Sequence, residues 1–234
     1  MHKTRVFRNI MEPREVGIAL AYLPVHVFLL PSLLIGYTLS SGKTLSQNYS
    51  ETIYFGIGLV VIVIFLWSFL RSSFDILMDN FGYCLMTIIV GVFGIMVLSQ
   101  FSAVIMLMME SEIMATLQIA SEGVGVADTR TLFVLGIGAV PVVEETLFRG
   151  LIFGAVRKRS RALAYLLSVL AYVFYSIWQS FFIGANVWVI LILVLSYIPE
   201  AVMLAWCYER SGTIWVPIIL SASISTLAMI PFMV

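Results

Sequence analysis

The chain has 234 residues, of which 61% are hydrophobic and only 11% are charged. Soluble domains carry about a quarter charged residues, so this composition excludes an ordinary soluble protein. The formal net charge is zero, which excludes the basic balance expected of a nucleic-acid-binding protein. We therefore expect an all-α fold, a polytopic bundle of transmembrane helices embedded in a lipid bilayer.

Seven segments are apolar and long enough to cross a bilayer, which takes about 20 residues. They cover residues 16–38, 52–70, 82–109, 131–156, 162–183, 187–208 and 213–233. A break inside the long third segment would raise the count to eight. Between the second and third segments, Arg71–Asn80 is expected to be a short cytoplasmic turn. The charged start of the chain lacks a small-residue cleavage site, so the first span is expected to direct membrane insertion.

Basic residues predict the orientation of these spans. They precede the first span and follow the second, fourth and sixth spans, as Lys3, Arg5, Arg8, Arg14, Arg71, Arg157, Lys158, Arg159, Arg161 and Arg210. The opposite loops contain only Lys43 and Arg130. The positive-inside rule then places the N-terminus in the cytoplasm and the C-terminus outside.

The density of polar motifs divides the chain near residue 130. Residues 1–130 are expected to form a three-span scaffold, and residues 131–234 are expected to form a four-helix core that carries the polar positions. Because short loops force neighbouring helices to pack antiparallel, both parts should form one membrane domain.

The fourth span contains three charged residues, Glu144, Glu145 and Arg149, in an otherwise apolar stretch. A charge in lipid is costly unless it is paired or faces a cavity. Glu145 and Arg149 are four residues apart and share a helix face, in the order that favours an ion pair. Glu144 lies about 100° around the helix, so it is predicted to be the free acid that can accept a proton. The alternative is that these charges only lock helices together.

Three stretches of the chain resemble the signatures of the CPBP family, which comprises type II CAAX prenyl endopeptidases, bacteriocin-processing proteins and related ABI-type intramembrane proteases. Residues 144–154, EETLFRGLIFG, resemble the first signature. Residues 167–178, LSVLAYVFYSIW, resemble the second, and residues 208–225, YERSGTIWVPIILSASIS, resemble the third. The likeness covers roughly residues 131–230.

The resemblance implies roles for these positions. In active members the first glutamate and the second-signature histidine activate water, while a histidine and an asparagine of the third signature stabilise the oxyanion. Glu144 then occupies the water-activating position, and Arg149 is the structural partner of Glu145.

Three of the family's catalytic positions carry other residues in this chain. The second-signature histidine is replaced by Trp178, and the third-signature histidine and asparagine are replaced by Ser221 and Ser225. An indole donates one hydrogen bond and accepts none. The resemblance therefore implies a degenerate member in which efficient proteolysis is impaired.

No cofactor is expected, because zinc needs His or Cys ligands and the sequence has no such cluster. A divalent metal such as Mg²⁺ or Mn²⁺ would need Glu144, Glu145 and Glu200 together, which depends on the sixth span bringing Glu200 alongside. Glu200 is instead expected to be a second partner of Arg149. His26, in the first span, is expected to be a satisfied core residue.

Two functions follow as hypotheses. In the first, the protein keeps the CPBP fold and a polar groove, and acts as a scaffold or regulator that binds a membrane or envelope protein, or a peptide. In the second, it is an active intramembrane endopeptidase that uses Glu144 as the base, with Ser221, Ser225 or Tyr175 as substitute donors. A small transporter is a weaker alternative, because the chain lacks paired broken helices in two halves. We expect an integral protein of a bacterial or archaeal cell membrane.

Overall fold

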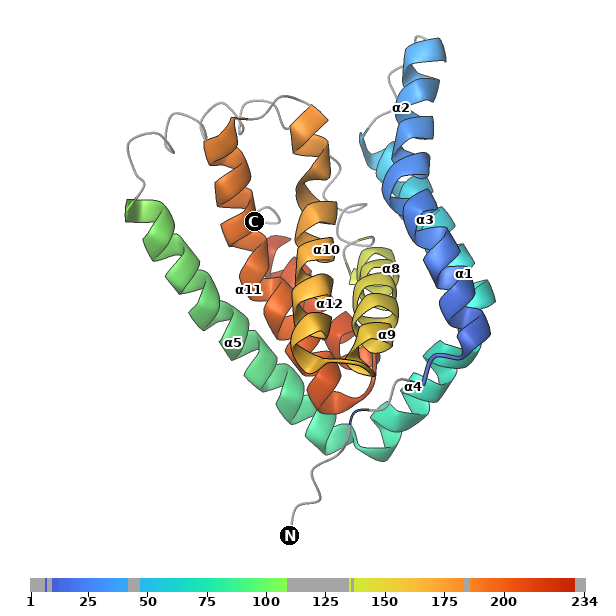
Figure 1. Ribbon diagram of the computed structural model, residues 1–234, viewed down its shortest axis with the longest axis vertical. Coiled ribbons are helices and arrows are strands. Elements are labelled where there is room, and N and C mark those ends of the chain that lie inside the picture. The colour runs from blue at the N-terminus through green and yellow to red at the C-terminus, as the bar shows by residue number, and fades with distance from the viewer. Residues whose placement is uncertain are drawn as a thin grey trace.

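The computed structural model describes residues 7, 10–41, 47–108, 135, 137–182 and 186–229. Every regular element within these ranges is a helix (Figure 1), which confirms the predicted all-α fold. In chain order they are α1 (Pro13–Pro24), η1 (Val25–Leu29), α2 (Leu30–Ser41), α3 (Gln47–Phe65), α4 (Trp67–Asp79), α5 (Phe81–Met108), α8 (Ala139–Glu145), η2 (Thr146–Phe153), α9 (Gly154–Arg157), α10 (Arg161–Phe182), α11 (Val187–Ser211) and α12 (Trp215–Met229).

Four helical stretches among the described residues are long and apolar enough to cross a membrane. They are Pro13–Thr38, Phe81–Met106, Arg161–Phe181 and Val187–Ser211. Much of their apolar surface is exposed, as at Phe93 and Phe101 of α5, which are 65% and 64% exposed. Apolar side chains exposed on this scale require lipid rather than water, so the chain is an integral membrane protein.

A fifth candidate crossing, which is either a broken span or a re-entrant loop, consists of two helices, α3 and α4, with an angle of 81° at the break between them. The predicted second span, residues 52–70, is therefore not straight. Residues 67–79 are helical, so the cytoplasmic turn predicted at Arg71–Asn80 is wrong. In contrast, α5 is continuous over Phe81–Met108, and no break there adds an eighth span.

The predicted count of about seven spans is higher than the four or five that helix length and composition support in the described residues. The helical stretch 139–157 contains Glu144, Glu145, Arg149 and Arg157, which exceed the charge that an ordinary span tolerates. Helix α12 has only 15 residues. These two segments depart from the prediction because one is polar in its middle and the other is short.

Helix ends that carry basic residues gather at one end of the bundle. Figure 1 shows α4, the connection between α9 and α10, and the turn between α11 and α12 at the same end. Glu209 of α11 fastens this end, because its carboxylate lies 2.7 Å from Arg157 Nε, 2.9 Å from Arg161 Nη2 and 2.7 Å from the Tyr165 hydroxyl. The position of these basic segments at one end of the bundle agrees with the prediction that every second connection, the basic one, lies on the same side of the membrane.

The segment formed by α8, η2 and α9 lies inside the bundle. Helices α3 and α12 pack against α8, while α1, α10 and α11 pack against η2. This segment buries Val143, Leu147, Phe148 and Leu151, so its apolar residues hold it among five neighbouring helices. The charged residues of the fourth predicted span therefore face other protein elements rather than lipid.

Candidate functional site

The ion pair predicted from the four-residue spacing is formed where α8 passes into η2. Arg149 Nη1 lies 2.8 Å from Glu145 Oε1, and both side chains are fully buried. In lipid or a protein interior such a pair is tolerated only when the charges also find hydrogen-bond partners. The pair thus identifies Glu145 as the arginine's partner and leaves Glu144 outside the contact.

The guanidinium of Arg149 has two further contacts. Its Nη2 lies 3.4 Å from the backbone carbonyl oxygen of Ala201 on α11, and its Cζ lies 4.2 Å from the centre of the Tyr172 ring on α10. A ring face attracts a cation by its quadrupole, more strongly where water is excluded. The arginine thereby ties η2 to α10 and α11.

Glu200 does not form the second ion pair that the sequence suggested. Among the described residues, the ion pair of Arg149 is with Glu145, and its contact on α11 is the Ala201 carbonyl oxygen. Glu200 is half-buried on α11, directly after the buried Pro199. Its charge acts on the arginine electrostatically from beyond ion-pair distance.

Glu144 is half-buried and faces α10 rather than Arg149. The Tyr175 hydroxyl of α10 is among the polar groups that act on its carboxyl group. That same hydroxyl lies 3.3 Å from the Tyr54 hydroxyl of α3. Tyr175, which the sequence suggested as a substitute donor, is therefore the polar neighbour of the free acid.

Trp178 is buried on α10, with 8% of its surface exposed. Its ring packs edge to face on Phe28 of η1, with 5.5 Å between ring centres. Ser221 is buried and Ser225 is half-buried on α12, which packs against α8. The fold thus places the helices of the three signature-like stretches against one another.

Several buried polar atoms of this region have no hydrogen-bond partner among the described residues. They are Glu145 Oε2, Thr146 Oγ1, Arg149 Nε and His26 Nε2. Buried polar groups are nearly always paired in folded proteins, and an unpaired one costs about 1–3 kcal/mol. Three of these atoms lie at the junction of α8 and η2, and the fourth belongs to η1, so the region has hydrogen-bonding capacity that its described residues do not use.

The sequence of this part of the chain matches a known family. Residues 127–227 match the family model described as type II CAAX prenyl endopeptidase Rce1-like. We refer to these matched residues as the Rce1-like domain. Neither a curated protein nor a solved structure matches the chain significantly. The match agrees with the CPBP resemblance of the three signatures and supports a CAAX-protease-like membrane protein.

A metal site made of three carboxylates is not formed in the Rce1-like domain. Within the part of the chain that the structure describes, no three His, Cys, Asp or Glu side chains are grouped as metal ligands. Glu145 forms an ion pair with Arg149, and Glu144 is a neighbour of Tyr175. The divalent-metal site of Glu144, Glu145 and Glu200 stays a weak prediction that these contacts do not favour.

Residues outside the matched region complete the surroundings of Glu144, and sequence reasoning missed most of them. Tyr54 comes from α3, while Tyr22 and His26 come from α1 and η1. The Tyr22 hydroxyl lies 3.2 Å from His26 Nδ1, and the Tyr54 hydroxyl donates to the His26 carbonyl oxygen at 2.9 Å. The one available signal was a histidine inside an apolar span, which is costly in lipid and marks a functional site by default.

Proposed function

We propose that this protein binds a peptide, or a segment of a membrane-protein partner, at the polar site of its Rce1-like domain without cleaving it efficiently. The site consists of Glu144 and Tyr175, supported by the ion pair of Glu145 with Arg149. The protein would act in a bacterial or archaeal cell membrane, where an envelope protein is the expected class of partner.

The observation that carries this proposal is the indole of Trp178. It stands where the resemblance places an imidazole, and it is packed against Phe28. A general acid–base group contributes about 10²–10⁴ to a rate, and one oxyanion donor contributes about 10²–10³. Replacing both would leave hydrolysis slow, whereas binding needs only the groove and its hydrogen-bonding groups.

Cavities next to the site support a binding role. One of about 170 Å³ is almost wholly apolar and is lined by Leu23, Phe28, Phe148, Phe174 and Tyr175, among others. Apolar clefts with a few convergent polar groups are typical of ligand sites. An extended or lipid-modified chain would place apolar side chains there and its backbone beside Tyr175.

The test uses purified full-length protein in detergent micelles and a fluorescent peptide that ends in a farnesylated CAAX sequence. We expect saturable binding by fluorescence anisotropy and no cleavage by mass spectrometry. Glu144→Gln should weaken binding, because it removes the acceptor at the site. Asp75→Asn, the same change at an exposed position of α4, is the control and should bind normally.

The second candidate is an active endopeptidase, which the contact between Glu144 and Tyr175 favours. It predicts turnover of the farnesylated peptide that Glu144→Ala abolishes, and that result would contradict the proposal. If the proposal holds, Trp178→His with Ser221→His should gain cleavage. The gain would show that the groove is intact and that only catalytic groups are absent.

A further inference from the structure

His26 is a fully buried histidine in η1, a π-helical segment that follows Pro24. Its ring stacks on Tyr54 with 4.4 Å between centres and lies 6.0 Å from the ring centre of Tyr175. Short π-helical segments inside α-helices occur frequently at functional sites. The second such segment, η2, begins directly after Glu145.

Two tyrosines, Tyr54 and Tyr175, neighbour both His26 and Glu144. Tyr54 donates to the His26 carbonyl oxygen at 2.9 Å, and its oxygen lies 3.3 Å from that of Tyr175. Tyr175 in turn interacts electrostatically with Glu144. The imidazole and the free acid therefore belong to one polar cluster, made by η1, α3, α8 and α10.

Close helix packing brings the imidazole to the start of the glutamate pair. A Cβ atom on Gly58 of α3 would lie 3.0 Å from Val143 Cγ2 and 3.4 Å from His26 Cε1. Val143 immediately precedes Glu144. The glycine thus leaves just enough room for η1 and α8 to meet against α3.

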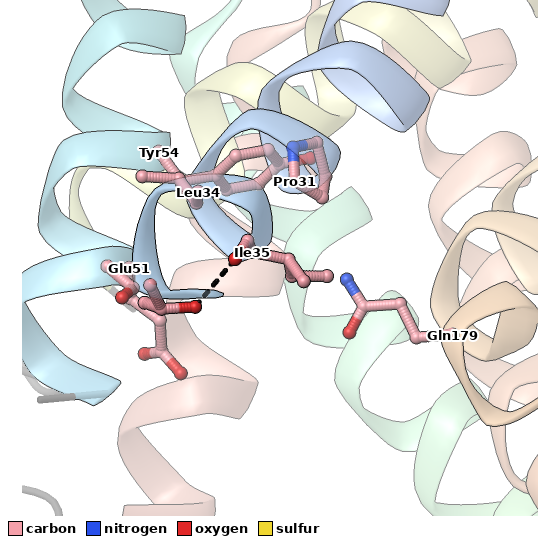
Figure 2. Close-up of a pocket in the computed structure, with 8 residues that line it drawn as sticks. Pro31, Leu34, Ile35, Glu51, Tyr54 and Gln179 are labelled. Carbon is pink, nitrogen blue, oxygen red and sulfur yellow. Dashed lines mark hydrogen bonds between the residues drawn. The ribbon is translucent and has the colours of Figure 1, made fainter. Parts of the chain in front are cut away.

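Cavities lie on two sides of this cluster. Tyr175 lines the apolar cavity described above. Tyr54 lines a second cavity of about 320 Å³ with Pro31, Leu34, Ile35, Glu51 and Gln179, shown in Figure 2. In that view Gln179 of α10 lies opposite Ile35 and Glu51. Each cavity is therefore lined by one of the two tyrosines whose hydroxyls are in contact.

The two ring nitrogens of His26 differ. Nδ1 is 3.2 Å from the Tyr22 hydroxyl, while Nε2 is buried with no hydrogen-bond partner among the described residues. When Tyr22 donates to Nδ1, the neutral ring carries its hydrogen on Nε2. That N–H then needs an acceptor, and a backbone carbonyl of a bound peptide supplies one.

We propose that His26 is a ligand-binding residue of the Rce1-like site, whose Nε2 donates a hydrogen bond to a backbone carbonyl of the bound peptide beside Glu144. The inference rests on the proposed peptide binding and adds a residue from outside the matched region. Tyr22 is the positioning residue, because its hydroxyl sets which ring nitrogen carries the hydrogen.

The chain has only two histidines, His2 and His26. A full-length His2→Ala protein labelled with ¹⁵N-histidine therefore gives signals from one imidazole. Titration with the farnesylated CAAX peptide should shift the Nε2 resonance of His26 and move Nδ1 much less. A ring that only fills the core would show no Nε2 shift while the peptide binds, and that result would overturn the inference.

Two substitutions give an independent measurement. His26→Gln keeps an amide donor near the position of Nε2, whereas His26→Asn keeps one near Nδ1 only. We expect His26→Gln to bind the peptide like the wild type and His26→Asn to bind roughly 2- to 10-fold more weakly, the loss of one hydrogen bond. Equal binding by both variants contradicts the inference. Absence of binding by the wild type instead refutes the proposed function and the inference with it.

Discussion

Arg149 is the most constrained residue of the site, since its charge is fully buried and three groups surround it. Glu145 neutralises it, Tyr172 stacks on it, and the Ala201 carbonyl oxygen accepts from it. Removing one member of a buried pair leaves the other charge uncompensated, which costs more than the pair contributes. The arginine therefore stabilises the junction that presents Glu144 to Tyr175.

Arg149→Leu should lower the free energy of unfolding by about 3–5 kcal/mol. Unfolding of the purified protein by a detergent titration measures this change. Arg161→Leu is the matched control, because Arg161 also pairs with a carboxylate but is 65% exposed, and exposed pairs contribute little to stability. Equal losses in the two variants would contradict the role given to the buried pair.

The double change Glu145→Leu with Arg149→Leu should be less destabilising than Arg149→Leu alone. Removing both charges leaves no unpaired ion, and apolar replacements of buried pairs are often neutral. The same detergent titration checks it. A double variant that is less stable than the single variant would contradict the idea that the unpaired charge of Glu145 causes the loss.

The ion pair could be predicted from the sequence, whereas the histidine cluster could not. Glu145 and Arg149 are one helical turn apart, so helix geometry alone brings them together. Tyr54 is 28 residues from His26 and 121 residues from Tyr175. No periodicity connects such positions, because their contact depends on how separate helices pack.

At the scale of the helix, the bend between α3 and α4 is the reason that the prediction of a straight second span, residues 52–70, was wrong. Leu66, which precedes α4, has no side-chain cap of its own. The buried carboxylate of Glu15 from α1 instead accepts from the Phe69 backbone N–H at 2.8 Å. A carboxylate at a helix N-terminus satisfies free N–H groups and opposes the helix dipole. Hydropathy could not predict this break, since the residue that caps it lies 54 positions away.

Glu15→Ala should destabilise the protein by about 1–3 kcal/mol, because the Phe69 N–H would lose its acceptor in a buried place. Thermal unfolding in micelles followed by circular dichroism measures the change. Asp75→Ala removes an exposed acid from the same helix, α4, and should leave the unfolding temperature nearly unchanged. An unchanged unfolding temperature for Glu15→Ala would show that the start of α4 does not depend on the Glu15 carboxylate.

Helix α5 packs closely on α11 and α12 through a small residue. A Cβ on Gly91 would lie 2.6 Å from Leu220 Cδ2 and 2.7 Å from Cys207 Sγ, whereas a Cβ on Gly82 meets nothing within 4 Å. Gly91→Ala should therefore cost about 1–3 kcal/mol by overpacking. Gly82→Ala should be neutral or stabilising by up to about 1 kcal/mol, because alanine favours a helix. Thermal unfolding of the two variants checks the difference, and stabilisation by Gly91→Ala would contradict the packing.

At the scale of the whole molecule, the basic residues at one end of the bundle predict its orientation in the membrane. Both native cysteines, Cys84 and Cys207, are buried, so they should not react with an impermeant maleimide. Ser41→Cys at the end of α2 should react in intact cells. Arg159→Cys, in the basic connection, should react only after the membrane is permeabilised. The reverse pattern would place the N-terminus outside.

The membrane class and the all-α fold follow from composition alone, while the number of crossings does not. Hydropathy treats a polar helix such as α8 with η2 like any other span, although it is surrounded by protein. It also cannot show where a segment bends or stops short of the full bilayer thickness. These properties depend on neighbouring helices, which a window along one segment does not include.

The Tyr54–Tyr175 hydroxyl contact joins the matched part of the chain to the part that precedes it. One side of the contact comes from α3, which lies before the matched residues 127–227, and the other comes from within them. Under the proposed binding function, substitutions within the first 126 residues would alter ligand choice even with every signature position unchanged. Ligand selectivity would then depend partly on residues that the family model does not cover.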